Sequence, residues 1–182
     1  MIAHRTVPFA VALSLMACSA STDAPTGPSV ATVGAPVASA SGGGHWFLVL
    51  PPEFGLPPIE QVLGFTARKH ADGSADGQIE YQQRFLDFHL RFQASITCMN
   101  VYDGNRVKYG GLITSSNDRD FPAGGYIWFQ GIDNGEGGFS PADQSTGSGF
   151  GDEVANEAFC NSPNPPNATF LADIDGDIQV HQ

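Results

Sequence analysis

The sequence predicts an all-β domain, either a single antiparallel β-sandwich or a partly closed barrel, with about 7–9 strands. The strongest observation is a strict alternation of apolar and polar residues over residues 86–98. A period of two is typical of a strand with one buried and one solvated face. Turn residues separate the other apolar runs, and helical periodicity is restricted to one turn at residues 152–157.

Each remaining strand is predicted from a short apolar or alternating run that lies beside a turn. The first run ends at two prolines, and a second is followed by a glycine- and aspartate-rich turn at residues 71–77. Asp103-Gly104-Asn105 is typical of a hairpin after the long strand. Because the long strand exceeds the usual length, we expect it to curve from one sheet into another. The strands are expected at residues 45–50, 63–68, 79–81, 86–98, 107–113, 125–129 and 178–180.

The composition limits the classes of molecule that the protein is expected to bind. The chain has 8 basic and 19 acidic residues and a formal net charge of -11, and its basic residues are scattered. Such a surface repels the phosphates of nucleic acids, so we expect no nucleic-acid partner. A hydrophobic content of 41% is sufficient for a packed core.

The N-terminus has the features of an export signal. An apolar run at residues 7–16 is too short to span a bilayer, and it leads into Leu15-Met16-Ala17-Cys18. This tetrapeptide resembles the lipobox of bacterial lipoproteins, which implies cleavage of residues 1–17 and lipid attachment to Cys18. Ser19 resembles the signal for sorting to the outer membrane, so the protein is expected on its periplasmic or cell-surface face. The alternative is ordinary secretory cleavage, after Ala20 or after residues 38–40.

Residues 18–44 are expected to form a lipidated cysteine and a tether, and residues 45–182 the β domain. The tether contains mainly Ser, Thr, Ala, Pro, Val and Gly, which cannot bury enough apolar surface to offset the entropy of ordering. At about 5–6 Å times the square root of the residue number, its mean reach is about 25–30 Å.

If Cys18 carries lipid, Cys98 and Cys160 remain as a pair in an oxidising compartment. A disulfide between them would stabilise the domain by roughly 4 kcal/mol in the chain-entropy model. Free thiols or a pair of metal ligands are the alternatives.

Several short motifs resemble a family of uncharacterised secreted bacterial β-domain proteins, often with a lipoprotein signal. The motifs are Gly42-Gly43-Gly44-His45, Ile96-Thr97-Cys98, Gly110-Gly111-Leu112-Ile113-Thr114, Asp133-Asn134-Gly135-Glu136-Gly137 and Gly176-Asp177-Ile178-Gln179-Val180-His181. The resemblance spans most of residues 42–182. It implies an exported β domain, and no activity.

Two acidic segments are candidates for a calcium site, because hard cations take several oxygen ligands. Asp133, Glu136 and Asp143 lie in or near a glycine-rich loop that would serve equally well as a hairpin turn. Residues 173–177 carry alternating aspartates, but Ile178 stands where an EF-hand loop needs glycine. A charged turn is the alternative for both segments. Apart from calcium, no cofactor is expected.

A binding or acid–base site is a weaker hypothesis. Asp87, His89 and Arg91 share the polar face of the long strand, where they would line a cleft or form a solvated sheet face. The sequence contains no nucleophile elbow, and no His-x-His or His-Glu-x-x-His motif, so no catalytic residue is assigned. Aromatic residues such as Trp46 and Trp128 would suit sugar or peptide recognition if exposed, but burial is commoner.

We therefore expect a non-enzymatic cell-envelope lipoprotein with a binding or structural β domain. Its expected partners are the membrane, through the lipid, and a glycan or an envelope protein. A small envelope hydrolase, or a calcium- or carbohydrate-binding module, is the alternative.

Overall fold

A computed structural model describes residues 34–49, 53, 55–136, 140–167 and 171–182. The expected signal peptide and Cys18 lie outside these residues. Among the described residues, no helix is long and apolar enough to cross a membrane.

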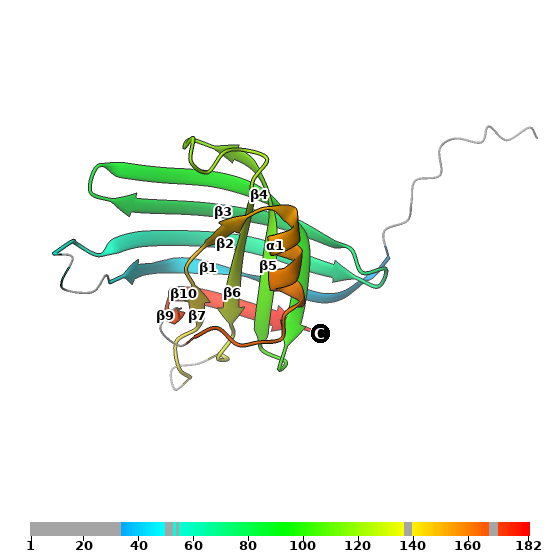
Figure 1. Cartoon of the computed structure of the whole chain (residues 1–182). Coiled ribbons are helices and arrows are strands. Elements are labelled where there is room, and N and C mark those ends of the chain that lie inside the picture. The colour runs from blue at the N-terminus through cyan, green and yellow to red at the C-terminus, as the bar shows by residue number, and fades with distance from the viewer. Residues whose placement is uncertain (1–33, 50–52, 54, 137–139, 168–170) are drawn as a thin grey trace, which may run out of the picture. The chain divides into compact units, whose positions relative to one another are not determined.

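The described chain is mostly β-structure with one short helix (Figure 1). The elements are β1 (Pro36–Leu48), β2 (Ile59–His70), β3 (Ala75–Phe85), β4 (Phe88–Tyr102), β5 (Arg106–Ser116), β6 (Tyr126–Ile132), β7 (Gln144–Thr146), β8 (Gly149–Gly151), α1 (Glu153–Asn161), β9 (Leu171–Asp173) and β10 (Asp175–His181).

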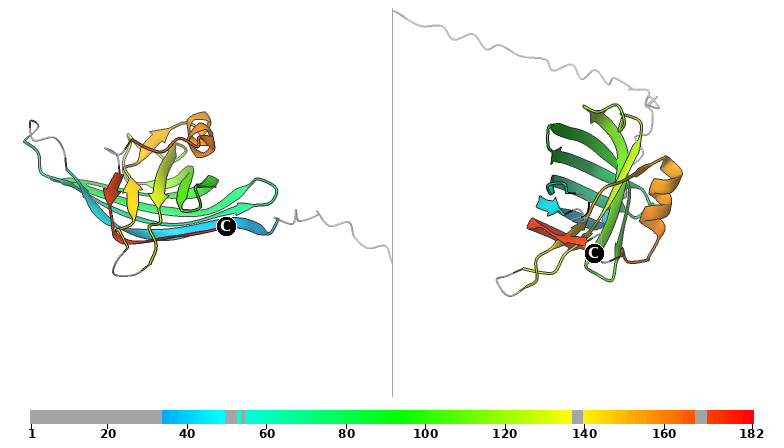
Figure 2. Two further views of the ribbon diagram at one scale, coloured as in Figure 1. Left: turned by 90° about the horizontal axis from the view of Figure 1, so that it is seen from below. Right: turned by 60° about the vertical axis from the view of Figure 1, so that its left-hand side comes forward.

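The strands form one antiparallel sheet that curls into a nearly closed barrel, which confirms the predicted fold class. Its strand order is β10-β1-β2-β3-β4-β5-β6-β7-β9, with β8 paired to β6. The long strands β1–β3 and β10 lie in one layer and β6–β8 in another, with the core between them (Figure 2). Register shifts at Gln93/Ala94 and Ile96/Cys98 let β4 bend between the layers, as its length predicts.

The domain begins earlier than the composition predicts. Residues 36–44, which the composition places in the tether, belong to β1, so the expected boundary between residues 44 and 45 is wrong. The physical reason is close packing between β1 and its two neighbours. A Cβ at Gly42 would overlap the Asp177 carbonyl oxygen, and one at Gly43 would overlap that of Leu63. Glycine here allows neighbouring backbones to approach, which composition alone does not distinguish from a flexible linker.

The core contains the inward-facing residues of the alternating strands, as the period of two predicts. Aromatic rings cross it in contact: Phe65 stacks on Tyr109 with centroids 4.0 Å apart, and Tyr81 stacks on Phe92 at 4.9 Å. Trp46 is also buried.

Helix α1 packs on the outer face of β4–β6 (Figure 1). Asp152 caps its N-terminus by accepting a hydrogen bond from the Ala155 N–H at 2.9 Å. The predicted disulfide between Cys98 and Cys160 joins the last turn of the helix to β4. Beside it, Tyr102 Oη donates to the Cys160 carbonyl oxygen at 2.6 Å. The helix is thus fixed to the sheet by a covalent bond and by satisfied terminal carbonyls.

Candidate functional site

The acidic residues of the predicted calcium loop hold the edge of β10. Asp143 is buried, and its Oδ2 accepts a hydrogen bond from the Ile178 N–H at 2.6 Å. Asp133 Oδ2 accepts from the Val180 N–H at 3.0 Å, and its Oδ1 accepts from the Gly135 N–H. These carboxylates supply acceptors to backbone donors that no neighbouring strand satisfies.

The third residue of that candidate set, Glu136, is exposed, and its Oε1 accepts a hydrogen bond from Gln179 Nε2 at 3.3 Å. Asp173, Asp175 and Asp177 are all exposed, at the end of β9 and the start of β10. Within the described part of the chain, no group of three or more His, Cys, Asp or Glu side chains is placed to hold a metal ion.

Asp87, His89 and Arg91 do not form one cluster. Asp87 lies in the turn between β3 and β4, whereas His89 and Arg91 are exposed on the outer face of β4. Arg91 lines a hollow that has a volume of about 370 Å³.

That hollow is the largest of three that adjoin on the outer face of β2–β5; we call them together the polar trough. The other two have volumes of about 230 and 210 Å³, and Glu80 lines all three. Most of the other side chains that line them are amides or hydroxyls: Thr66, Gln78, Gln82, Gln93, Ser95, Thr114, Ser115, Ser116 and Asn117.

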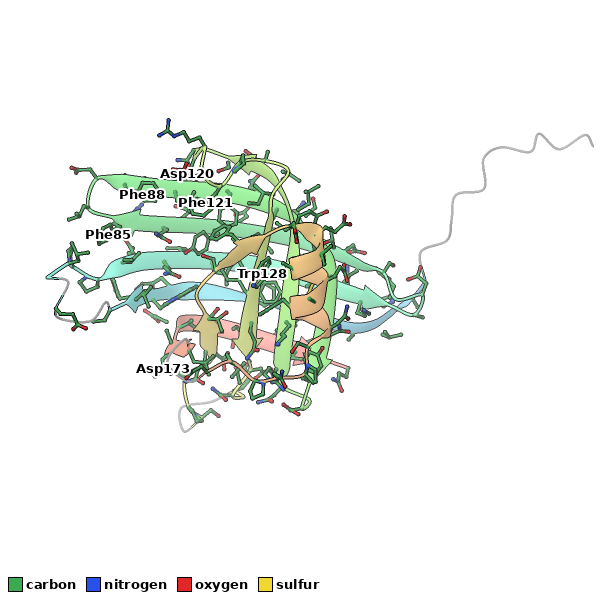
Figure 3. All side chains as sticks on the ribbon, viewed as in Figure 1. Phe85, Phe88, Asp120, Phe121, Trp128 and Asp173 are labelled. Carbon is green, nitrogen blue, oxygen red and sulfur yellow. A yellow bond between two sulfur atoms is a disulfide. The ribbon has the colours of Figure 1, made fainter. Side chains whose placement is uncertain are left out.

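A hollow of a different character lies between β6, α1 and the connection from β7 to β8; we call it the apolar hollow. Its volume is about 410 Å³. Trp128, Phe159, Pro166 and Leu48 supply its apolar lining, and residues 146–149 supply two hydroxyls and two glycines. Figure 3 shows Trp128 beside α1, on the side of β6 that carries the helix.

The indole of Trp128 is positioned by its neighbours. It lies against β8, where a Cβ at Gly149 would overlap its Nε1 atom and one at Gly151 would lie 2.9 Å from its Cη2 atom. The Phe159 ring stacks with it at a centroid distance of 5.9 Å. Two glycines of β8 therefore make the space that the indole fills.

One polar contact connects the apolar hollow to the core. Burial raises the pKa of Tyr81 to about 12, and a hydrogen bond with the Ser148 side chain opposes that rise. Tyr81 Oη also donates to Gln83 Oε1 at 3.0 Å. Ser148 is a lining residue of the hollow, so its hydroxyl lies where a ligand and the barrel interior meet.

The sequence places the aromatic residues on strands but does not indicate which of them are accessible to solvent. The structure buries Trp46 and Tyr109 and leaves Trp128 partly exposed. Phe159 and Pro166 carried no signal in the sequence. The one signal in the sequence is the glycine spacing at residues 147–151, and it does not by itself indicate contact with Trp128.

Comparisons with family models, with curated proteins and with solved structures found no match to this chain. The function is therefore inferred from the chain's own residues.

Proposed function

We propose that the protein is an exported, lipid-anchored, non-enzymatic binding domain that takes a small and largely apolar molecule in the apolar hollow. The observation that carries this proposal is the hollow itself, with a Trp128 indole at its wall and few polar groups around it. Ligand sites are usually concavities of about 300–1,000 Å³ with mostly apolar linings and a few polar groups that fix orientation. The hollow, at about 410 Å³, lies within that range.

The lining indicates the chemistry of the ligand. Trp128 and Phe159 offer ring surfaces whose centroids are 5.9 Å apart and whose planes are inclined by 29°, which favours contact with a flat or chain-like apolar group. The Ser148 hydroxyl is the group that would recognise a single polar atom of the ligand. No Asp, Glu, Lys or Arg is among the described lining residues, so a highly charged ligand would lose hydration without gaining a partner.

Contacts within the protein fix the walls of the apolar hollow in place without a ligand. The disulfide fixes the last turn of α1, which carries Phe159, and Asn100 Nδ2 donates to the Cys160 carbonyl oxygen at 3.0 Å. A site that is already ordered loses little side-chain entropy on binding.

The test uses the full chain with Cys18→Ala, which cannot be lipidated and needs no detergent. The probe is the uncharged N-phenyl-1-naphthylamine, measured by its fluorescence and by energy transfer from tryptophan. Gly147→Leu should weaken probe binding about tenfold, or about 1.4 kcal/mol. A Cβ at Gly147 meets no atom within 4 Å, so the backbone accepts the leucine while its side chain occupies space at the hollow.

The matched control is Gly64→Leu in the polar trough, where a Cβ also meets no atom within 4 Å. This variant should bind the probe as the parent does. Equal loss in both variants, or unchanged binding in Gly147→Leu, would contradict the assignment of the site.

The membrane part of the proposal has its own test. Fractionation of cells that produce the unmodified chain should find it with the outer membrane, and Cys18→Ala should release it. Retention of the Cys18→Ala chain in membranes would count against lipid anchoring.

A further inference from the structure

We infer that the polar trough is a second binding site and that it takes a glycan. The inference is independent of the apolar hollow, because the two sites share no lining residue. It rests on the register of β1–β5, on two glycines that lower one end of the trough, and on polar side chains that have no partner among the described residues.

The strand register places one row of residues across β1–β5. Gly43 pairs with Gly64, Gly64 with Glu80, Glu80 with Gln93, and Gln93 with Ser115. Directly opposed residues in adjacent antiparallel strands point to the same face of the sheet. The row is therefore a continuous path, perpendicular to the strands, on the face turned away from the core.

Two further rows flank this path on the same face. One contains Gln82 and Arg91, which pair across β3 and β4, and the other contains Gln78 and Ser95. Because Gly43 and Gly64 have no side chains, the path is lower than its flanks at the β1–β2 end. A Cβ at Gly64 would meet no atom within 4 Å, so the space above it is open.

The charged groups of the trough have no ionic partner among the described residues, unlike those of the row in which Glu60 of β2 lies opposite Arg84 of β3. There, Arg84 Nη1 lies 3.5 Å from Glu60 Oε2 and the two charges are paired. Among the described residues, neither Glu80 nor Arg91 forms an ion pair or a side-chain hydrogen bond. A carboxylate and a guanidinium therefore face the same hollow with their hydrogen-bonding capacity unused.

The glutamine side chains of the trough are likewise free to form hydrogen bonds with a ligand. Within the described chain, the side chains of Gln78, Gln82 and Gln93 make no hydrogen bond to protein. A carboxamide both donates and accepts, and so does each hydroxyl or acetamido group of a sugar chain. The set of three carboxamides, one carboxylate and one guanidinium matches a ligand with many donor–acceptor groups spaced along a chain.

Other ligand classes fit less well. The trough has one cationic side chain beside one anionic side chain, which does not favour a polyanion. Most of its lining side chains carry amide, hydroxyl or charged groups, although Phe65, Ile79, Phe92 and Ala94 also contribute, whereas an apolar ligand needs mostly apolar walls. Part of the rim is already ordered, because Asn117 Oδ1 accepts from the Arg91 N–H at 2.7 Å and its Nδ2 donates to the His89 carbonyl oxygen at 2.8 Å.

The experiment is calorimetric titration of the Cys18→Ala full chain with chitotetraose and, separately, with maltotetraose, each up to about 10 mM, which covers weak dissociation constants. Chitotetraose carries acetamido groups and maltotetraose does not, so the pair distinguishes their contribution. Binding of at least one of them is expected. Gly64→Leu should abolish it, and Gln93→Ala should weaken it about threefold to tenfold, the loss expected for one hydrogen bond.

Gly147→Leu is the matched control and should bind the oligosaccharide as the parent does. Comparable loss in Gly147→Leu and Gly64→Leu would overturn the placement of the site in the trough. Absence of binding to both oligosaccharides by a folded parent would overturn the inference and would leave the apolar-ligand proposal untouched.

Discussion

Asp143 accepts a hydrogen bond from the backbone N–H of Ile178 at 2.6 Å, and this bond joins β10, at one end of the rolled sheet, to the segment that leads into β7 near the other end. The other oxygen of the same carboxylate accepts from the Asn134 N–H at 2.8 Å. One side chain thus satisfies donors on two segments that are not paired as strands. The near-closure of the barrel depends on an acidic side chain as well as on strand pairing.

Asp143→Asn should destabilise the domain by about 1–3 kcal/mol, because an amide replaces one acceptor by a donor that faces a backbone N–H. Chemical denaturation monitored by circular dichroism measures the change. Asp177→Asn, at an exposed neighbour of Ile178, is the control and should leave the free energy of unfolding nearly unchanged. An unchanged Asp143→Asn domain would show that the carboxylate does not support closure.

Gly110→Ala should destabilise the domain by about 1–3 kcal/mol through overpacking. A Cβ there would overlap Asn156 Oδ1 and would lie 2.8 Å from the Ile127 carbonyl oxygen, so α1 must move away from the sheet. Gly64→Ala is the matched control, because it adds the same atom on another strand where nothing lies within 4 Å. Equal melting temperatures of the two variants would contradict the close approach of α1.

The disulfide should contribute strongly to stability, because it spans 62 positions of sequence. The Cys98→Ala/Cys160→Ala double variant is expected to lose about 4 kcal/mol, which lowers the melting temperature by about 10 °C. Reductant should lower the melting temperature of the parent and have no effect on the double variant. Alkylation of both cysteines in the unreduced parent would show that the bond is absent.

The stability of the domain should fall as the pH rises above about 6.5, because of His70. A hydrogen bond to Asp76 is the largest cause that raises the pKa of His70, and the Gly34 carbonyl oxygen contributes further. His70 Nε2 lies 2.5 Å from Asp76 Oδ2 and its Nδ1 lies 2.6 Å from that carbonyl oxygen, so the protonated ring donates to both. Arg68 and Asp72 are the other charged groups that face this pair.

The direction of this pH dependence follows from the linkage between protonation of His70 and folding. A folded pKa above the unfolded value of 6.5 means that the stabilisation is complete below that value and is lost as the pH rises through the folded pKa. Melting temperatures measured between about pH 5.5 and 9 should show this decline. The slope should be smaller in His70→Gln, and an identical slope would exclude His70 as its source.

The fold class could be predicted because the alternation over residues 86–98 reports directly on which side chains are buried. Asp103-Gly104-Asn105 is likewise a local signal, and the turn forms with Asp103 and Gly104 at φ values of 57° and 82°. The start of β1 could not be predicted, because the reason for glycine at residues 42–44 is the close approach of β2 and of β10, which is distant in sequence.

The candidate sites were less accessible to sequence reasoning. Arg91 was identified as a candidate, but the residues that surround it come from β3 and β5, and only the register brings them together. The apolar hollow combines Leu48, Trp128 and Phe159, which lie on three elements far apart along the chain. Hydrophobic periodicity does not indicate which side chains from distant elements lie close together in the fold.

Strand β1 also determines how far the apolar hollow stands from the point where the chain enters the domain. The strand starts at Pro36, next to the Gly34 contact with His70, and ends at Leu48, which lines the hollow. At about 3.3 Å per residue, these two ends are about 40 Å apart. Because β1 is hydrogen-bonded to β2 on one side and to β10 on the other, this separation is fixed within the domain. A molecule bound in the hollow is therefore held at the end of the strand that is remote from Pro36.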